Sequence, residues 1–261
     1  MPEYNEEDLK KLTQDAIFFI LTQESKRPVF TKASVMKGIE MTNRPPTVQT
    51  QIWEDAIQQL RDTFGYEMKS IEEYGGKKGD YMLRNKFQDA TNEAEQHMEC
   101  TEEECEEQSL LLIVLSVIHM NGGAARQDQL YAFLARSGLY DGKGNQNDHN
   151  VKQLIEKKWE KNNYIKISKD DASDPDSPKL LYKWGPRAEV EIKKSDILKF
   201  VAHIYNKNVD EFTDEYKEII DKEGEDCFKE PEVNNQGDAN VQLGWTNHAI
   251  KPRVKDIPNL H

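Results

Sequence analysis

The apolar and polar positions of the chain change their spacing several times, and these changes divide it into helix-length and strand-length segments. Apolar residues recur every three or four positions over residues 9–20, which is the spacing of an amphipathic helix. Thr31, a favourable N-cap residue, begins a short second helix over residues 31–39. A third apolar stripe covers residues 52–64. The sequence therefore predicts three consecutive helices.

A strand pair is predicted directly after the third helix. Residues 66–71 and 80–84 alternate between apolar and polar side chains, and glycine-rich residues 75–79 between them are typical of a hairpin tip. Three helices followed by a hairpin, in fewer than about 90 residues, are typical of the winged-helix variant of helix-turn-helix. We therefore predict a first winged helix in residues 1–88.

The same order of elements returns in residues 108–187. It begins with a nearly continuous apolar run, which is too short to cross a bilayer because crossing needs about 20 residues, and is therefore expected to be buried. Helices are expected at residues 110–120, 127–137 and 149–161, and strands at residues 164–168 and 180–184. Trp159 and Trp184 are expected to pack in the core. The predicted fold class is mainly α with small β wings, as a tandem winged helix.

Three further segments complete the predicted organisation. Residues 89–107 contain many Glu and no Lys or Arg, which indicates a solvated acidic linker. Residues 188–223 contain two more helical patterns, so C-terminal helices are expected there. Residues 224–261 are polar and interrupted by prolines, which favours a disordered tail.

Composition narrows the possible environments and partners. The N-terminus is acidic, without the basic and apolar segments of a signal peptide, so we expect an intracellular location. Three cysteines, an odd number without framework spacing, do not predict a disulfide scaffold. A net charge of −13 over 261 residues argues against nucleic-acid binding through overall charge, but it leaves room for a local basic face.

Such a basic face is predicted in the second half, where basic residues outnumber acidic ones between residues 149 and 199. The candidate phosphate contacts are Lys152, Lys157, Lys161, Lys166, Lys169, Lys179, Lys183, Arg187, Lys193 and Lys194. The alternative is a solvated helix face, because Glu156 and Glu160 can pair with the lysines at helical spacing. Arginine is scarce and no Asn or Gln cluster offers bidentate base contacts, so any binding is expected to be independent of sequence.

Other candidate sites are weaker. Lys77 and Lys78 lie between glycines, but the spacing is not that of a phosphate loop and a plain hairpin turn is favoured. A residue trio in the acidic linker superficially resembles a metal site but lacks the ligand spacing, namely His97, Cys100 and Cys105. His119, on the apolar helix, is expected to be a core or interface histidine. We find no catalytic motif, so no enzyme, cofactor or metal is predicted.

Several of these segments together resemble the MAGE homology domain family. The resemblance rests on the apolar run over residues 110–122, the spacing of Val151, Leu154 and Ile155, Tyr164, and the Trp-Gly-Pro-Arg motif that ends at Arg187. Residues 19–33 are similar to the opening segment of that domain, and the match covers roughly residues 9–205. Among MAGE proteins, the chain most resembles the member found in the SMC five/six chromosome-maintenance complex.

The resemblance implies a non-catalytic adaptor in the nucleus, associated with chromatin, that acts in DNA repair and recombination. Its implied partners are a RING-type ubiquitin-ligase subunit (non-SMC element one), a kleisin subunit (non-SMC element four) and double-stranded DNA bound by the second winged helix. The RING-binding positions implied here are Phe19, Ile20 and Leu21. The alternatives are a free-standing MAGE protein that regulates a RING ligase without binding DNA, and a sequence-specific transcription factor.

Overall fold

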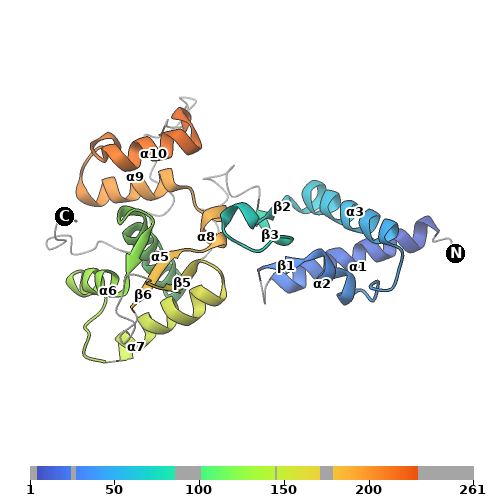
Figure 1. Cartoon of the computed structure of the whole chain (residues 1–261), viewed down its shortest axis with the longest axis horizontal. Coiled ribbons are helices and arrows are strands. Elements are labelled where there is room, and N and C mark those ends of the chain that lie inside the picture. Colours follow the sequence, from blue (N-terminus) through green and yellow to red (C-terminus); the bar gives the residue numbers. More distant parts are fainter. Residues whose placement is uncertain (1–4, 25–27, 86–100, 145, 171–178, 229–261) are drawn as a thin grey trace. The chain divides into compact units, whose positions relative to one another are not determined.

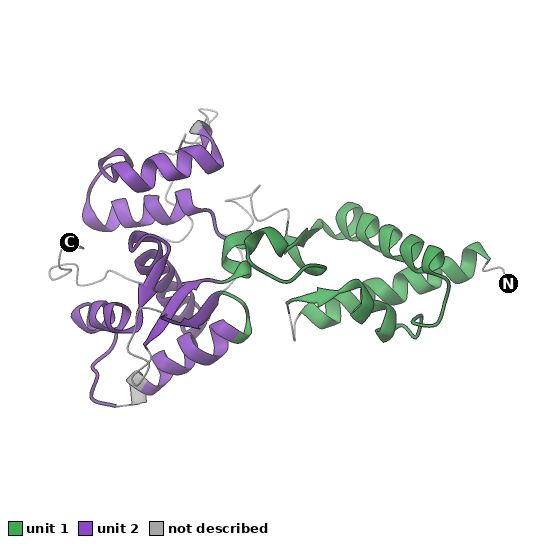
Figure 2. Cartoon of the chain, viewed as in Figure 1, with its two compact units in different colours: residues 1–91, 161–164, 185–191 green, residues 92–160, 165–184, 192–261 purple. Residues whose placement is uncertain are grey.

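The chain forms two compact units in a computed structural model (Figures 1 and 2). The structure describes residues 5–24, 28–85, 101–144, 146–170 and 179–228. Unit 1 comprises residues 1–91, 161–164 and 185–191, and unit 2 comprises residues 92–160, 165–184 and 192–261. The predicted winged helices supply most of these units, but two short segments of the second one pack within unit 1.

Unit 1 contains a winged helix of three helices, α1 to α3, and three strands, together with two further short helices. Its helices are α1 (Glu6–Glu24), α2 (Lys32–Gly38), α3 (Pro46–Phe64), the 3-10 helix η1 (Glu72–Tyr74) and α8 (Pro186–Glu191). Its strands are β1 (Phe30–Thr31), β2 (Tyr66–Ser70) and β3 (Asp80–Asn85), in the antiparallel order β1-β3-β2. The sequence predicted only two strands, because β1 is too short to show an alternating pattern.

Local signals explain where these helices begin and end. Thr31 caps α2 as predicted: its side chain accepts a hydrogen bond from the Ser34 backbone at 3.0 Å, and Ser34 Oγ accepts one from the Thr31 backbone. Pro46 occupies the first turn of α3, where a missing N–H costs nothing. Gly65 ends α3 with φ 68°, a left-handed conformation that glycine adopts without strain.

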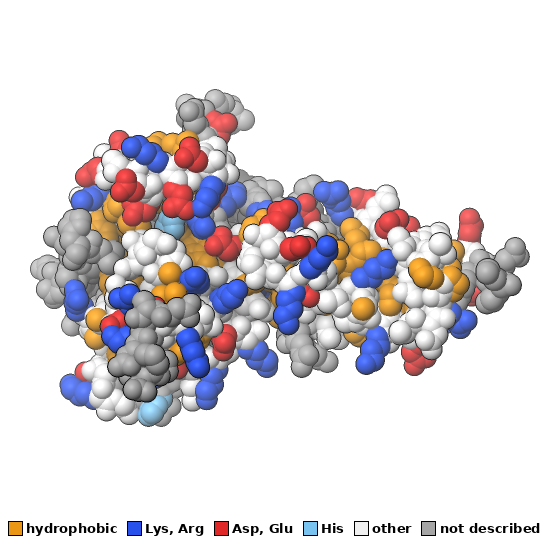
Figure 3. Space-filling model, in the orientation of Figure 1, with side chains coloured by type: hydrophobic (Ala, Val, Ile, Leu, Met, Phe, Trp, Pro, Cys, Tyr) orange, Lys and Arg blue, Asp and Glu red, His pale blue; other side chains and the backbone are white. Residues whose placement is uncertain are grey.

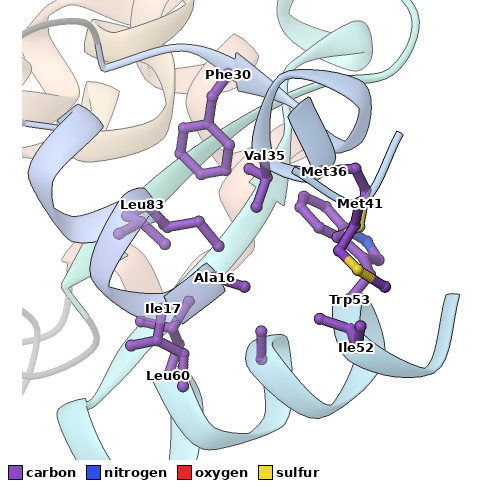
Figure 4. Close-up of a cluster of buried hydrophobic side chains, with 12 residues drawn as sticks. Ala16, Ile17, Phe30, Val35, Met36, Met41, Ile52, Trp53, Leu60 and Leu83 are labelled. Carbon is purple, nitrogen blue, oxygen red and sulfur yellow. The ribbon is translucent and has the colours of Figure 1, made fainter. Parts of the chain in front are cut away.

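The core of unit 1 lies between α1, α2, α3 and the sheet. Figure 4 shows Phe30, Val35, Trp53 and Leu83, from four different elements, converging on one apolar cluster. The buried residues of α1 recur at three- and four-residue intervals, as the periodicity predicted. This cluster fixes which face of α1 is available to a partner.

Unit 2 repeats the same plan. Its helices are α5 (Glu102–Met120), α6 (Gln127–Arg136), α7 (Gln146–Gln153), α9 (Lys194–Tyr205) and α10 (Thr213–Glu223), with a π-helix, η3 (Leu154–Trp159), and two 3-10 helices, η4 (Val209–Glu211) and η5 (Glu225–Phe228). Its strands are β4 (Ala124–Arg126), β5 (Ile165–Lys169) and β6 (Leu180–Trp184), in the antiparallel order β4-β6-β5. The tandem winged-helix fold class is therefore confirmed.

The apolar run lies on α5 and is buried as predicted. Trp159 and Trp184 are 1% and 7% exposed, and the Trp184 indole N–H donates to the Leu115 carbonyl oxygen at 2.9 Å. Strand β4 and helix α8 are short and, like β1, were not predicted. The trailing helices α9 and α10 lie within residues 188–223, where C-terminal helices were predicted, and α9 packs against α5.

Two predicted boundaries were wrong. Helix α5 begins at Glu102 rather than residue 110, so the end of the predicted acidic linker is helical. Thr101 and Glu104 form a capping box, and acidic residues suit the positive end of a helix dipole. The tail was predicted to begin at residue 224, but η5 extends the helical structure to Phe228. The Phe228 ring stacks on Tyr216. Residues 89–100 and 229–261 lie outside the described residues.

Candidate functional site

The first candidate surface is the exposed side of α1 in unit 1. Phe18 is 72% exposed, whereas Ile20 is fully buried in the core. Phe19 is half-buried and packs on α2, where a Cβ at Gly38 would lie 2.1 Å from the Phe19 ring. Leu21 is half-buried against the same core. Of the predicted RING-binding residues, Phe19 and Leu21 are therefore partly exposed on this surface. Ile20 is a core residue and is not accessible to a partner.

Phe18 is the residue that sequence reasoning missed on this surface. It is the most exposed of the large hydrophobic side chains in the described chain, followed by Phe64 at 46% and Tyr74 at 37%. All three belong to unit 1. Hydrophobic side chains are visible over α1 and α3 in Figure 3. An exposed phenylalanine beside half-buried apolar neighbours is typical of an anchor in a protein interface.

The second candidate surface carries the lysines of unit 2. Seven of the predicted lysines are exposed in this unit, namely Lys152, Lys157, Lys166, Lys169, Lys179, Lys183 and Lys193. Lys194 is half-buried, and its ammonium lies 5.6 Å from the centre of the Trp184 ring. Lys161 and Arg187 belong instead to unit 1. The structure therefore brings eight of the ten predicted phosphate contacts into one unit.

A half-buried carboxylate holds the helix that precedes the wing. Glu156, on η3, accepts hydrogen bonds from the hydroxyls of Tyr131 at 2.8 Å and Tyr182 at 2.9 Å. Burial, followed by the neighbouring Glu156, raises the pKa of Tyr182, so both hydroxyls stay protonated donors. The predicted pairing of Glu156 with lysines is thus replaced by tyrosine contacts, and the ammonium of Lys152 lies 5.6 Å from the centre of the Tyr131 ring.

The start of α5 makes a second connection to this helix. Glu107 accepts hydrogen bonds from Lys158 Nζ at 2.6 Å and from the Trp159 indole at 3.2 Å. A residue assigned from sequence to a linker therefore helps to hold η3 in place. The π-helix at residues 154–159 is a local departure from α geometry of the kind often found near functional sites.

The wing of unit 2 places basic side chains in register. Lys166 on β5 is directly opposite Lys183 on β6, and both are exposed. At the loop end of the wing, directly before β6, Lys179 Nζ lies 2.9 Å from Asp128 Oδ2, and this contact lowers the pKa of Asp128. Arg126, at the end of β4, pairs with Asp170 at 2.9 Å. Arg126 was not among the predicted contacts, because β4 was not recognised as part of the sheet.

Arg187 has a structural environment within unit 1. Its guanidinium lies 2.7 Å from Glu191 and 3.4 Å from Glu24, and 4.8 Å from the centre of the Tyr164 ring. The Tyr164 hydroxyl also donates to Glu191, at 2.7 Å. Two carboxylates and an aromatic ring already engage this cation, so its contacts favour a role in holding α8.

The glycine of the Trp-Gly-Pro-Arg motif has a packing reason. A Cβ at Gly185 would lie 2.1 Å from the Asn163 carbonyl oxygen, and the Gly185 N–H donates to the Tyr164 carbonyl at 2.8 Å. Only glycine permits this close approach of two backbone segments. The motif therefore fixes the beginning of α8.

The remaining candidates are not assembled into a chemical site. Lys77 and Lys78 are exposed in the loop between η1 and β3. Among the described residues no group of His, Cys, Asp and Glu is arranged to hold a metal ion, and His97 and Cys100 lie outside them, whereas Cys105 is half-buried on α5. In the described part of the chain, no helix is long and apolar enough to span a membrane.

His119 is a buried side chain of α5, as expected. Its ring centre lies 6.2 Å from that of Trp184, and Nε2 has no hydrogen-bond partner among the described residues. Burial, with a smaller contribution from Lys194, lowers the pKa of His119 to about 4. The ring is therefore neutral at pH 7.

Comparison with known proteins supplies the family. Residues 17–195 match the model of the MAGE homology domain. The chain belongs to the MAGE family. It is 25% identical over 219 residues to human "Melanoma-associated antigen F1", covering 83% of this chain and 67% of that protein. It is 24% identical over 216 residues to the human "Non-structural maintenance of chromosomes element 3 homolog", covering 83% of this chain and 68% of that protein.

A solved structure shares the fold of this chain. A chain of the "Nse1-Nse3-Nse4 complex" superposes with a TM-score of 0.71 at 23% identity, covering 83% of this chain and 99% of that chain. The residues that match the MAGE model include the strands of both winged helices and the motif residues 184–187, whereas α10 follows the match.

Proposed function

We propose that this MAGE protein is a non-catalytic adaptor subunit of the SMC five/six chromosome-maintenance complex, equivalent to non-SMC element three. The observation that carries the proposal is the fold match to a chain of the Nse1-Nse3-Nse4 complex, which covers 99% of that chain. The human and mouse relatives named for chromosome maintenance support it. The proposal places the protein in the nucleus on chromatin, in DNA repair and recombination, bound to a RING subunit and a kleisin subunit.

The RING subunit docks on the α1 surface of unit 1 in this proposal. Phe18 is the apolar side chain that a partner can bury, with Phe19 and Leu21 beside it. Burial of a large aromatic side chain at an interface centre contributes more than most neighbouring contacts. Ile20 belongs to the core, so a charge placed there would test folding rather than docking.

Substitution of Phe18 tests this docking directly. We expect Phe18→Asp to abolish co-purification with non-SMC element one while leaving the thermal melting curve unchanged, because the side chain is 72% exposed in the free protein. Tyr74→Asp, also at an exposed aromatic of unit 1, is the matched control and should retain the partner. Full retention by Phe18→Asp would refute the docking surface.

Double-stranded DNA is the third proposed partner, bound through the lysines of the predicted second winged helix, residues 108–187. Lysine contacts to phosphates are independent of sequence and weaken as salt rises. We expect charge reversal of Lys152, Lys157 and Lys161 together to weaken duplex binding in a low-salt titration, with equal affinity for unrelated sequences. Unchanged affinity would reject these three contacts. A strong preference for one sequence would instead favour a transcription factor.

The second candidate function is a free-standing MAGE protein that regulates a RING ubiquitin ligase and does not bind DNA. The similarity to melanoma-associated antigens, at 25% identity for the human F1 protein, favours it. Co-purification from cells followed by identification of the bound subunits separates the two functions. Recovery of SMC five, SMC six and the kleisin supports the adaptor, and recovery of a RING ligase alone supports the alternative.

A further inference from the structure

The last described residues of unit 2 pack on its trailing helices. Helix η5 follows α10 after Gly224, and both belong to the same unit as α9. The centre of the Phe228 ring lies 4.9 Å from that of the Tyr216 ring on α10, with 25° between the ring planes. These values describe a stacked aromatic pair, an arrangement that is favourable beyond the area that it buries.

A lysine of α9 completes this contact. The Lys199 ammonium lies 5.8 Å from the centre of the Phe228 ring and donates a hydrogen bond to the Cys227 carbonyl oxygen at 2.9 Å. Asp196, on the same helix, lies 3.8 Å from this ammonium. Tyr216 and Lys199, which we call the aromatic clamp, therefore hold one aromatic side chain and the backbone carbonyl that precedes it.

The contacts of the aromatic clamp require little of the segment that occupies it. The stack uses the face of an aromatic ring, and the hydrogen bond uses a backbone carbonyl, which every residue carries. Neither contact depends on the other side chains of η5. A segment of another protein that presents an aromatic residue can therefore make the same two contacts.

The occupying segment is short and incompletely buried. Helix η5 has four residues, Glu225–Phe228, and 3-10 helices of this length are not stable in isolation. Phe228, Tyr216 and Lys199 are all half-buried. Short segments with few buried contacts are the parts of a fold that open most readily. The aromatic clamp can therefore exchange its occupant without unfolding of unit 2.

The surroundings of the aromatic clamp are acidic. Helices α10 and η5 together contain seven acidic and two basic side chains, and Figure 3 shows acidic side chains over α10. Burial raises the pKa of the Cys227 thiol, and the nearby carboxylates of Glu223 and Asp196 raise it further. The occupying segment itself contains Glu225 and Asp226. A basic segment would be attracted to this region, and a polyanion would be repelled from it.

We propose that the aromatic clamp is a docking site for a basic peptide segment of a partner protein that carries an aromatic residue, and that Phe228 occupies this site in the free protein and is displaced on binding. Tyr216 and Phe228 follow residues 17–195, which match the MAGE model. The site is separate from the proposed RING surface on α1 and from the proposed DNA contacts in residues 108–187.

Fluorescence anisotropy of the full-length protein with the labelled peptide Gly-Lys-Lys-Phe-Lys-Gly tests this site. We expect Phe228→Ala to bind the peptide roughly five- to ten-fold more tightly than the wild type, as for a site that is open in about 0.1 to 0.2 of the wild-type molecules. Tyr216→Ala added to Phe228→Ala should abolish the gain, whereas Tyr216→Phe keeps the ring and should retain it. Phe64→Ala, at a partly exposed aromatic of unit 1, is the control and should bind like the wild type.

Two further peptides separate the aromatic contribution from the charge contribution. A peptide with Ala in place of Phe should bind Phe228→Ala and the wild type equally weakly. A peptide with Glu in place of each Lys should bind both proteins more weakly than the basic peptide. Undiminished binding of the Ala peptide would indicate general attraction to an acidic surface and overturn the aromatic site. Undiminished binding of the Glu peptide would overturn the basic character of the partner.

Hydrogen exchange of the wild type provides a measurement that does not depend on the folding of a variant. Saturating basic peptide should accelerate deuterium uptake at residues 225–228, because this segment leaves the aromatic clamp. Unchanged uptake would overturn the displacement of Phe228. Absence of peptide binding to Phe228→Ala, with a wild-type melting curve, would overturn the docking site and leave Phe228 with a structural role alone.

Discussion

Neighbouring residues of α1 have opposite environments. Ile17 and Ile20 are buried, whereas Phe18 is 72% exposed. A helix turns by about 100° per residue, so the apolar stripe includes Ile17 and Ile20 but its edges are ambiguous when Phe18, Phe19 and Leu21 are apolar as well. Phe19 lies against Gly38 at one edge of the stripe, whereas Phe18 projects into solvent.

Also at the residue scale, His119 predicts a pH dependence of stability. Its pKa is about 4 in the folded protein and about 6.5 when unfolded, so the unfolded state binds the proton more readily between these values. The contribution of neutral His119 to the free energy of unfolding is therefore present above about pH 6.5 and is lost as the pH falls toward 4. We expect His119 to account for a loss on the order of 2 kcal/mol between pH 7 and pH 5.

Urea unfolding at both pH values, for the wild type and His119→Gln, measures this contribution. The variant should lose less stability on acidification than the wild type. His203→Gln, at an exposed histidine of α9, serves as the control and should keep the wild-type dependence. Equal pH dependence in the wild type and His119→Gln would contradict the buried neutral state.

At the scale of the element, α5 shows how a helix extends beyond its apolar stripe. Its first turn is acidic and its core-facing residues begin at Leu112, so hydrophobic spacing alone places the beginning too late. The Thr101 and Glu104 capping box sets the actual beginning. Glu107 then connects that polar turn to Lys158 and Trp159.

The capping box yields a stability prediction. Thr101→Ala removes the side-chain acceptor for the Glu104 backbone N–H, so we expect the unfolding free energy to fall by about 1 kcal/mol. Thr101→Ser keeps the acceptor and should be nearly neutral. Denaturant unfolding of both variants measures the difference, and a Ser variant as unstable as the Ala variant would rule out the cap.

At the scale of the whole molecule, the two compact units are not continuous in sequence, because unit 1 includes residues that follow parts of unit 2 along the chain. The segment after β6 leaves unit 2 and forms α8 in unit 1. There Val190 packs with Ile71 and Met82 in a small apolar cluster. Arg187, Glu191 and Tyr164 supply polar contacts to the same segment. Unit 1 is therefore completed by residues that follow the second wing.

A double-mutant cycle tests this arrangement. Ile71→Ala and Val190→Ala should each destabilise the protein, and their effects should be non-additive by about 0.5 kcal/mol or more because the side chains are in contact. Val190→Ala combined with Leu130→Ala, a core residue of unit 2, should be additive within about 0.5 kcal/mol. Unfolding free energies in urea provide the values. Additivity of the first pair would contradict the contact.

The sequence alone determined the order of elements in the tandem winged helix, because the longer helices and strands show the periodic spacing of apolar residues that identifies each type of element. It also determined the Thr31 cap and the burial of Trp159 and Trp184, since these follow from side-chain type and position. Strand β1 and helix α8 carry too few residues for a period, so tertiary packing decided them. The structure alone also showed that Phe18 is exposed, that Arg187 is engaged by carboxylates, and that Lys166 faces Lys183, because each depends on which distant segment lies beside it.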